Sequence, residues 1–176
     1  MDIMQNLQAS GGLDAIASQL GISREEAERG AGALLPSLLD GFGRSDEGEI
    51  EGQLQQLGGG GLADNVIGPE PTEIAKGNQL LGRIFGSKDV SRQVATQTAQ
   101  SSGVNQDTLK KMLPILAMLV GGLLMKRSRG AGGGLGSVLG GILGQMAGGR
   151  GGMGGGLGGG LGGVLGSVLG GALGRR

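Results

Sequence analysis

Glycine sets the strongest limit on what this chain can fold into, because it fills about half of the positions from Gly130 to Gly174. Nearly all the other residues there are Leu, Val, Ile, Met or Ala, so the segment is low in complexity without being polar. Each glycine in a helix interior costs about 0.8–1 kcal/mol relative to alanine. We therefore expect this segment to be disordered when isolated and helical only where it packs against something else.

The leucines of this tail repeat every four residues, and a row of glycines follows one position behind. In a helix this pattern forms an apolar ridge beside a small-residue groove, which is how helices approach closely in membranes and in glycine-zipper assemblies. We predict self-association or membrane contact through this ridge, with extended glycine-rich packing as the alternative. The predicted residues are Leu135, Leu139, Leu143, Leu157, Leu161, Leu165, Leu169, Leu173, Gly158, Gly162, Gly166 and Gly170.

The side chains that most enzymes use for chemistry are absent. The chain has no His, Cys, Trp or Tyr and two Phe, so it lacks an imidazole base, a thiolate nucleophile, the usual zinc ligands and disulfides. No carboxylate lies in an apolar context that would raise its pKa. We predict a protein that is not an enzyme, with no catalytic residue, no cofactor, no metal and no small-molecule substrate.

The remaining chain is expected to be all-α and to form one compact domain from two helical units. The first unit covers residues 1–43, an acidic and Gly/Pro-rich linker covers 44–70, the second unit covers 71–129, and the tail covers 130–176. Within the first unit, Ser23 and Glu26 form a capping box that predicts the start of a long helix. Pro36 is expected to kink or split that helix.

The two units share a pattern that indicates a diverged duplication, with chance similarity of short helical segments as the alternative. Gly21-Ile22-Ser23 precedes the first long helix, and Gly103-Val104-Asn105 precedes a second one that contains Pro114. Both turns also match the Ala-x-x-x-Gly pattern of a helix-turn-helix. Because Glu25, Glu26 and Glu28 would face the polyanion, nucleic-acid binding is only a minor alternative.

An almost continuous apolar stretch covers residues 112–125 of the second unit. At about fourteen residues it is short for a membrane span, which needs about 20. Two interpretations stay open, namely a buried core helix and an interfacial membrane helix anchored by basic residues at its ends. The basic flanks are Lys110, Lys111, Lys126, Arg127 and Arg129.

Charge is divided between the two halves of the chain although its net charge is zero. Up to Glu73 there are 13 Asp/Glu and 3 Lys/Arg, and from Ile74 onward there are 2 Asp/Glu and 12 Lys/Arg. The halves therefore either pair with each other or offer a basic surface to an anionic membrane or nucleic acid. The first residues lack a basic region followed by an apolar run, so we expect a cytoplasmic protein or one peripheral to the inner membrane.

Several of these residues also resemble a known family. The segment from Gly77 to Gly86, followed by Ser102-Gly103-Val104 and the segment from Lys111 to Ala117, resembles the bacterial domain-of-unknown-function family 937 and the similar YidB group. The resemblance covers most of residues 1–125 and implies an all-helical fold without any established activity. The sequence thus favours a self-associating or partner-binding helical protein, with a membrane-associated protein as the alternative.

Overall fold

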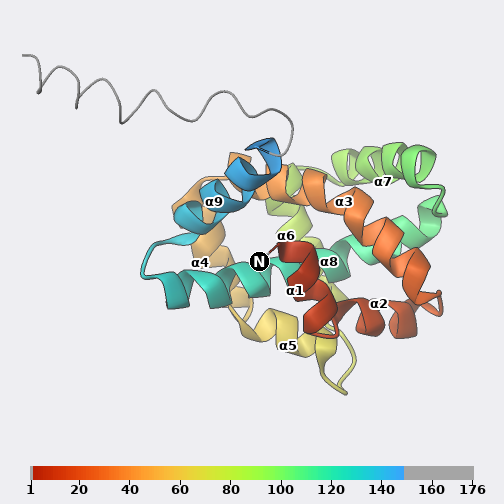
Figure 1. Ribbon diagram of the computed structural model, residues 1–176, viewed down its shortest axis with the longest axis horizontal. Helices are drawn as coiled ribbons and strands as arrows, with labels where there is room; N and C mark the ends of the chain where they lie inside the picture. The colour runs from red at the N-terminus through yellow and green to blue at the C-terminus, as the bar shows by residue number, and fades with distance from the viewer. Residues whose placement is uncertain (1, 149–176) are drawn as a thin grey trace, which may run out of the picture. The chain divides into compact units, whose positions relative to one another are not determined.

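The computed structural model describes residues 2–148, and these form α-helices without strands (Figure 1). The predicted all-α class is confirmed. A compact unit ends at Leu143, and a second unit, Gly144–Arg176, is described only over its first residues. The helices of the described residues are α1 (Ile3–Ala9), α2 (Gly12–Leu20), α3 (Arg24–Arg44), α4 (Glu47–Leu57), α5 (Gly61–Ile67), α6 (Ile74–Phe85), α7 (Lys88–Ser102), α8 (Gln106–Ala131) and α9 (Leu135–Gly148).

Polar side chains fix where several of these helices begin. Ser23 Oγ accepts a hydrogen bond from Glu26 N at 3.1 Å, as expected for the N-cap of α3. Asn105 Oδ1 accepts one from Asp107 N at 2.8 Å at the start of α8. Each cap satisfies one of the backbone amides that have no partner within the first helical turn. The predicted starts of both long helices are therefore confirmed.

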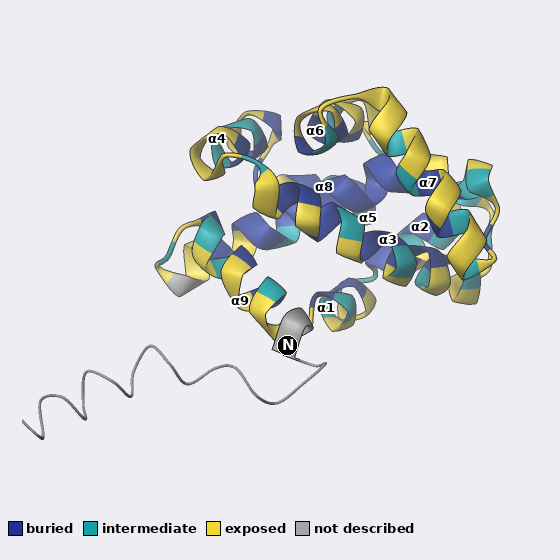
Figure 2. Ribbon diagram, turned by 90° about the horizontal axis from the view of Figure 1, so that it is seen from above, coloured by how far each residue is buried: buried dark blue, intermediate teal, exposed yellow. Residues whose placement is uncertain are grey.

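Helix α8 lies at the centre of the core. It contacts α2, α3, α4, α5, α6 and α7, and Figure 2 shows its middle as buried. Its apolar residues from Met112 to Val120 are at most 2% exposed. The core is almost entirely aliphatic, with Phe42 as its large aromatic side chain. Burying a Leu, Ile or Met side chain contributes about 1.5–3 kcal/mol, so α8 supplies much of the stabilisation of this domain.

Two glycines allow α8 to pack closely against its neighbours, one at the contact with α6 and one at the contact with α5. A Cβ built at Gly77 on α6 would overlap the carbonyl oxygen of Pro114 and lie 2.7 Å from its carbonyl carbon. A Cβ at Gly122 on α8 would lie 2.5 Å from the backbone nitrogen of Ala63 on α5. Real side chains do not come this close to backbone, so glycine is required at both helix crossings.

The segment 44–70, expected to be a linker with a short helix around Glu49–Leu57, forms two helices: α4 agrees with the expected helix, whereas α5 was not expected. Its apolar positions are three and four residues apart, which places them on one face of a helix. These positions are buried in the common core: Ile50, Leu54, Leu57, Leu62, Ala63 and Val66. The acidic residues lie toward solvent, and the glycines at 58–60 form the turn between the two helices.

The sequence predicted a kink or a split at Pro36, and helix α3 is not split there but continues through this residue. Proline removes the hydrogen bond to the carbonyl of the residue four positions earlier, which is Gly32. Gly32 and Pro36 are both exposed, so water can reach that carbonyl. The helix therefore continues until Arg44, and its apolar face stays in the core.

The turns before α3 and before α8 have the same local structure. Gly21 and Gly103 both adopt a left-handed backbone conformation, with φ of 65° and 70°. Each donates its backbone N–H to an alanine carbonyl four residues earlier, Ala17 in one turn and Ala99 in the other. In addition, α2 contacts α8 while α7 contacts α3, so the two helix pairs interlock.

Candidate functional site

The first leucines of the glycine-rich segment form one face of α9 and pack against the folded domain. Leu135 is fully buried, Leu139 is 5% exposed, and Leu143 is partly buried beside the same core. Ile142 is also buried, which completes the spacing expected for one helix face. Leu135, Leu139 and Leu143 therefore share one apolar face, which packs within their own chain and not against a second copy or a membrane in this structure.

A carboxylate anchors the start of α9. Glu47, the first residue of α4, accepts a hydrogen bond from the backbone N–H of Gly136 at 2.6 Å through Oε1. The amides of a first helical turn favour negative charge, so this contact also uses the helix dipole. A Cβ at Gly134 would lie 2.8 Å from Glu47 Oε1, and one at Gly136 would lie 2.5 Å from its carboxyl carbon. These glycines therefore make room for the carboxylate.

The opposite face of α9 presents glycine. Gly140 and Gly141 are exposed, and a Cβ built at either position would meet nothing within 4 Å. The rest of the predicted ridge lies outside the described residues. That part comprises Leu157, Leu161, Leu165, Leu169, Leu173, Gly158, Gly162, Gly166 and Gly170.

The structure does not bring the two basic flanks of the apolar stretch together. Lys110 and Lys111 lie near the start of α8 and are exposed, whereas Lys126, Arg127 and Arg129 lie near its end. At 1.5 Å per residue, roughly 22 Å of helix separates Lys111 from Lys126. The flanks therefore belong to different surfaces.

Charges from the two halves of the chain pair within the folded domain. Lys126 Nζ lies 2.5 Å from Asp64 Oδ1 on α5, and Arg83 on α6 lies 3.5 Å from Glu49 on α4. These pairs are exposed to solvent, and each contributes at most about 1 kcal/mol. They fit the interpretation in which the acidic and basic halves fold against each other.

The apolar stretch at 112–125 is core within this fold. Among the described residues, one helix segment, Gln106–Gly130, is long and apolar enough to cross a membrane by length and composition. Most of it is buried by the surrounding helices. Exposing this face to lipid would require the six helices packed on it to separate.

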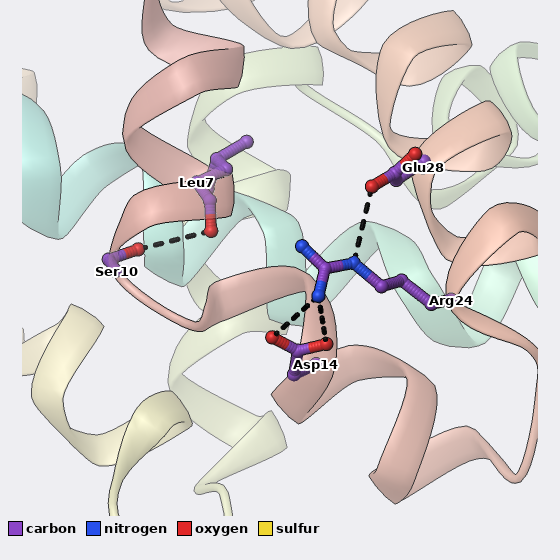
Figure 3. A network of polar contacts seen from close by, with 5 residues as sticks. All are labelled: Leu7, Ser10, Asp14, Arg24 and Glu28. Carbon is purple, nitrogen blue, oxygen red and sulfur yellow. Dashed lines mark hydrogen bonds and ion pairs between the residues drawn. The ribbon is translucent and has the colours of Figure 1, made fainter.

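The charges around the turn before α3 are engaged with one another (Figure 3). Arg24 lies 3.1 Å from Asp14 on α2 and 3.3 Å from Glu28 on its own helix. In the second turn, Gln106 donates a hydrogen bond to Thr96, and Leu109 and Leu113 are buried. Both turns thus make polar contacts within their own helix pairs, and the ion pairs among these contacts are exposed and weak.

One cleft combines positive charge with an apolar floor, and our sequence reasoning did not identify it. It lies between α6, α7 and α8 and has a volume of about 360 Å³. Three cations line it, Lys88 and Arg92 from α7 and Lys110 from α8. The sequence contained one signal for this cleft, because Lys88 and Arg92 are four residues apart and therefore lie on the same face of a helix. Lys110 reaches the same cleft only because α7 and α8 pack together.

The sequence comparison decides the family. A sequence model of a bacterial family of unknown function matches residues 2–127, which is most of the chain. The chain belongs to the DUF937 family. The resemblance noted in the sequence is thereby confirmed, and the match of this DUF937 protein ends just before the glycine-rich segment. No curated protein and no solved structure matches the chain.

Proposed function

We propose that this DUF937 protein is a non-enzymatic, cytoplasmic helical protein that associates with itself through its glycine-rich tail. In this proposal the leucines from Leu157 to Leu173 pack against a helical surface of a second copy. The alternative partner is a different protein, in which case the same leucines pack against a helical surface of that protein.

Helix α9 is the observation that carries this proposal. Its leucines have the same four-residue spacing as the later ridge, and Leu135 and Leu139 are buried against helices. Its glycines cost about 0.8–1 kcal/mol each in a helix interior. The burial of Leu135, Leu139 and Ile142 contributes about 1.5–3 kcal/mol each, which offsets that cost. The later leucines, from Leu157 to Leu173, have the same spacing among glycines, so a helix there also requires an apolar surface to offset the cost of its glycines.

The experiment compares the full-length chain with a chain that ends at Gly148, which keeps α9. We expect light scattering to give a larger assembly for the full-length protein and a smaller one for the shortened protein. A full-length variant with serine at Leu157, Leu161, Leu165, Leu169 and Leu173 should behave like the shortened chain. The same number of copies per assembly in all three proteins would refute self-association through the tail.

Membrane association is the second candidate, with a peripheral position at the inner membrane. It is favoured by the apolar composition of the tail and by the basic residues Lys126, Arg127 and Arg129 before it. The same three proteins are mixed with vesicles that contain anionic lipid. This candidate would be favoured over self-association if only the full-length chain sediments with the vesicles and all three proteins have the same number of copies per assembly in the absence of lipid.

A further inference from the structure

The cleft between α6, α7 and α8 has the composition of a ligand site. Lys88, Arg92 and Lys110 contribute three positive charges to its lining, and no carboxylate lines it. Ser91 adds a hydroxyl group, and Leu113 belongs to the buried apolar side. Its volume of about 360 Å³ lies at the lower end of the range for small-molecule sites.

We propose that this cleft binds a phosphate monoester through Lys88, Arg92 and Lys110, with the ester's apolar carbon atoms against Leu81 and Leu113. A phosphate monoester carries a charge of about −1.5 to −2 at neutral pH. Three cations that line one cleft therefore suit a phosphate better than they suit a carboxylate ligand, which carries a single negative charge. Arginine and lysine are the side chains that bind phosphate oxygens in charge-assisted hydrogen bonds.

The existing partners of these cations leave them available to a ligand. Arg92 lies 3.5 Å from Asp89, and Lys110 lies 3.5 Å from Asp107. Both carboxylates are three residues away on the same helix and are more than four-fifths exposed. Exposed pairs of this kind are weak. Among the described residues, Lys88 has no carboxylate partner.

Gly82 provides a way to fill the cleft without disturbing the core. It lies within α6 and lines the cleft, and a Cβ built there would meet nothing within 4 Å. A leucine at this position therefore occupies the cleft while improving the helix propensity of α6. Gly52 on α4 is the matched control, because a Cβ there also meets nothing within 4 Å and the residue is outside the cleft.

The phosphate monoester group could come from a soluble metabolite or from a lipid headgroup, and two probes distinguish these sources. Calorimetry measures binding of butyl phosphate, a soluble monoester with an apolar carbon chain, to the full-length protein. Sedimentation measures binding to phosphatidylcholine vesicles with and without phosphatidic acid. Binding of butyl phosphate indicates a soluble ligand, and binding of the phosphatidic acid vesicles alone indicates the headgroup. Failure of both probes would overturn the proposal.

Variants decide whether binding occurs in the cleft. Lys88→Gln and Lys110→Gln should each weaken binding by about tenfold or more, because each removes a charge-assisted hydrogen bond. Lys111→Gln removes the neighbouring exposed charge outside the cleft and should leave binding unchanged.

Gly82→Leu should abolish binding while Gly52→Leu should not, with both proteins folded by circular dichroism. Equal losses in Lys110→Gln and Lys111→Gln would show non-specific charge attraction and overturn the proposal. Unchanged binding in Gly82→Leu would do the same. Because none of these residues belongs to the tail, the outcome is independent of self-association.

Discussion

Two glycines on the same helix should respond to alanine with opposite changes in stability. Gly77 and Gly82 both lie within α6. A Cβ at Gly77 would overlap the backbone of Pro114 on α8, whereas a Cβ at Gly82 would meet nothing within 4 Å. Alanine gains about 0.8–1 kcal/mol in helix propensity at either position. The difference between the two variants therefore reports the close approach of α6 and α8.

The expected magnitudes follow from that geometry. Overpacking of a core typically costs about 1–3 kcal/mol, and the upper value applies here because the obstacle is backbone. Gly77→Ala should thus lose about 2 kcal/mol after its propensity gain, and Gly82→Ala should gain about 1 kcal/mol. For a domain of this size each kcal/mol shifts Tm by about 4 °C, so the two Tm values should differ by roughly 10 °C.

Urea titration and thermal melts followed by circular dichroism at the helix band measure both variants against the parent protein. Equal m-values would show that the compactness of the folded and unfolded states is unchanged. The reasoning is refuted if Gly77→Ala is as stable as Gly82→Ala, because α6 and α8 would then not need the glycine for their contact.

Three further perturbations test the anchoring of α9 and the surface charges. Leu135→Ala should destabilise the domain by about 2–5 kcal/mol in urea titration, and a loss below 1 kcal/mol would place α9 outside the cooperative unit. Glu47→Ala should speed hydrogen exchange of the first amides of α9, whereas Glu51→Ala should not; equal rates would mean that the carboxylate contact has no effect. Lys126→Met, which removes the pair with Asp64, should change the free energy of unfolding by less than about 1 kcal/mol, and a larger loss would show that this exposed pair is more than a surface contact.

Local signals were sufficient to predict much of the fold. Ser23 and Asn105 mark helix starts because a cap depends on residues only two or three positions away. Gly21 and Gly103 mark the preceding helix ends for the same reason, since a left-handed backbone favours glycine at that one position. The all-α class follows from such short-range patterns and from the helical spacing of the apolar residues.

Features that depend on distant residues could not be predicted in the same way. The glycines and acidic residues of 44–70 indicated a linker, yet Ile50 and Leu54 are buried by helices that lie elsewhere in the sequence. The burial of Leu135 likewise depends on the folded domain that receives it. Lys110 lines the same cleft as Lys88 only because α7 and α8 pack together.

The central position of α8 has a consequence for the order in which the protein can mature on the ribosome. Helices α2 to α7 are all synthesised before the helix on which they pack is complete at Ala131. At about 5–20 residues per second, synthesis from the end of α2 at Leu20 to the end of α8 at Ala131 takes roughly 6–22 s. During this interval the earlier helices lack α8 as a partner, and their leucine faces can be covered only by the contacts that they make with one another.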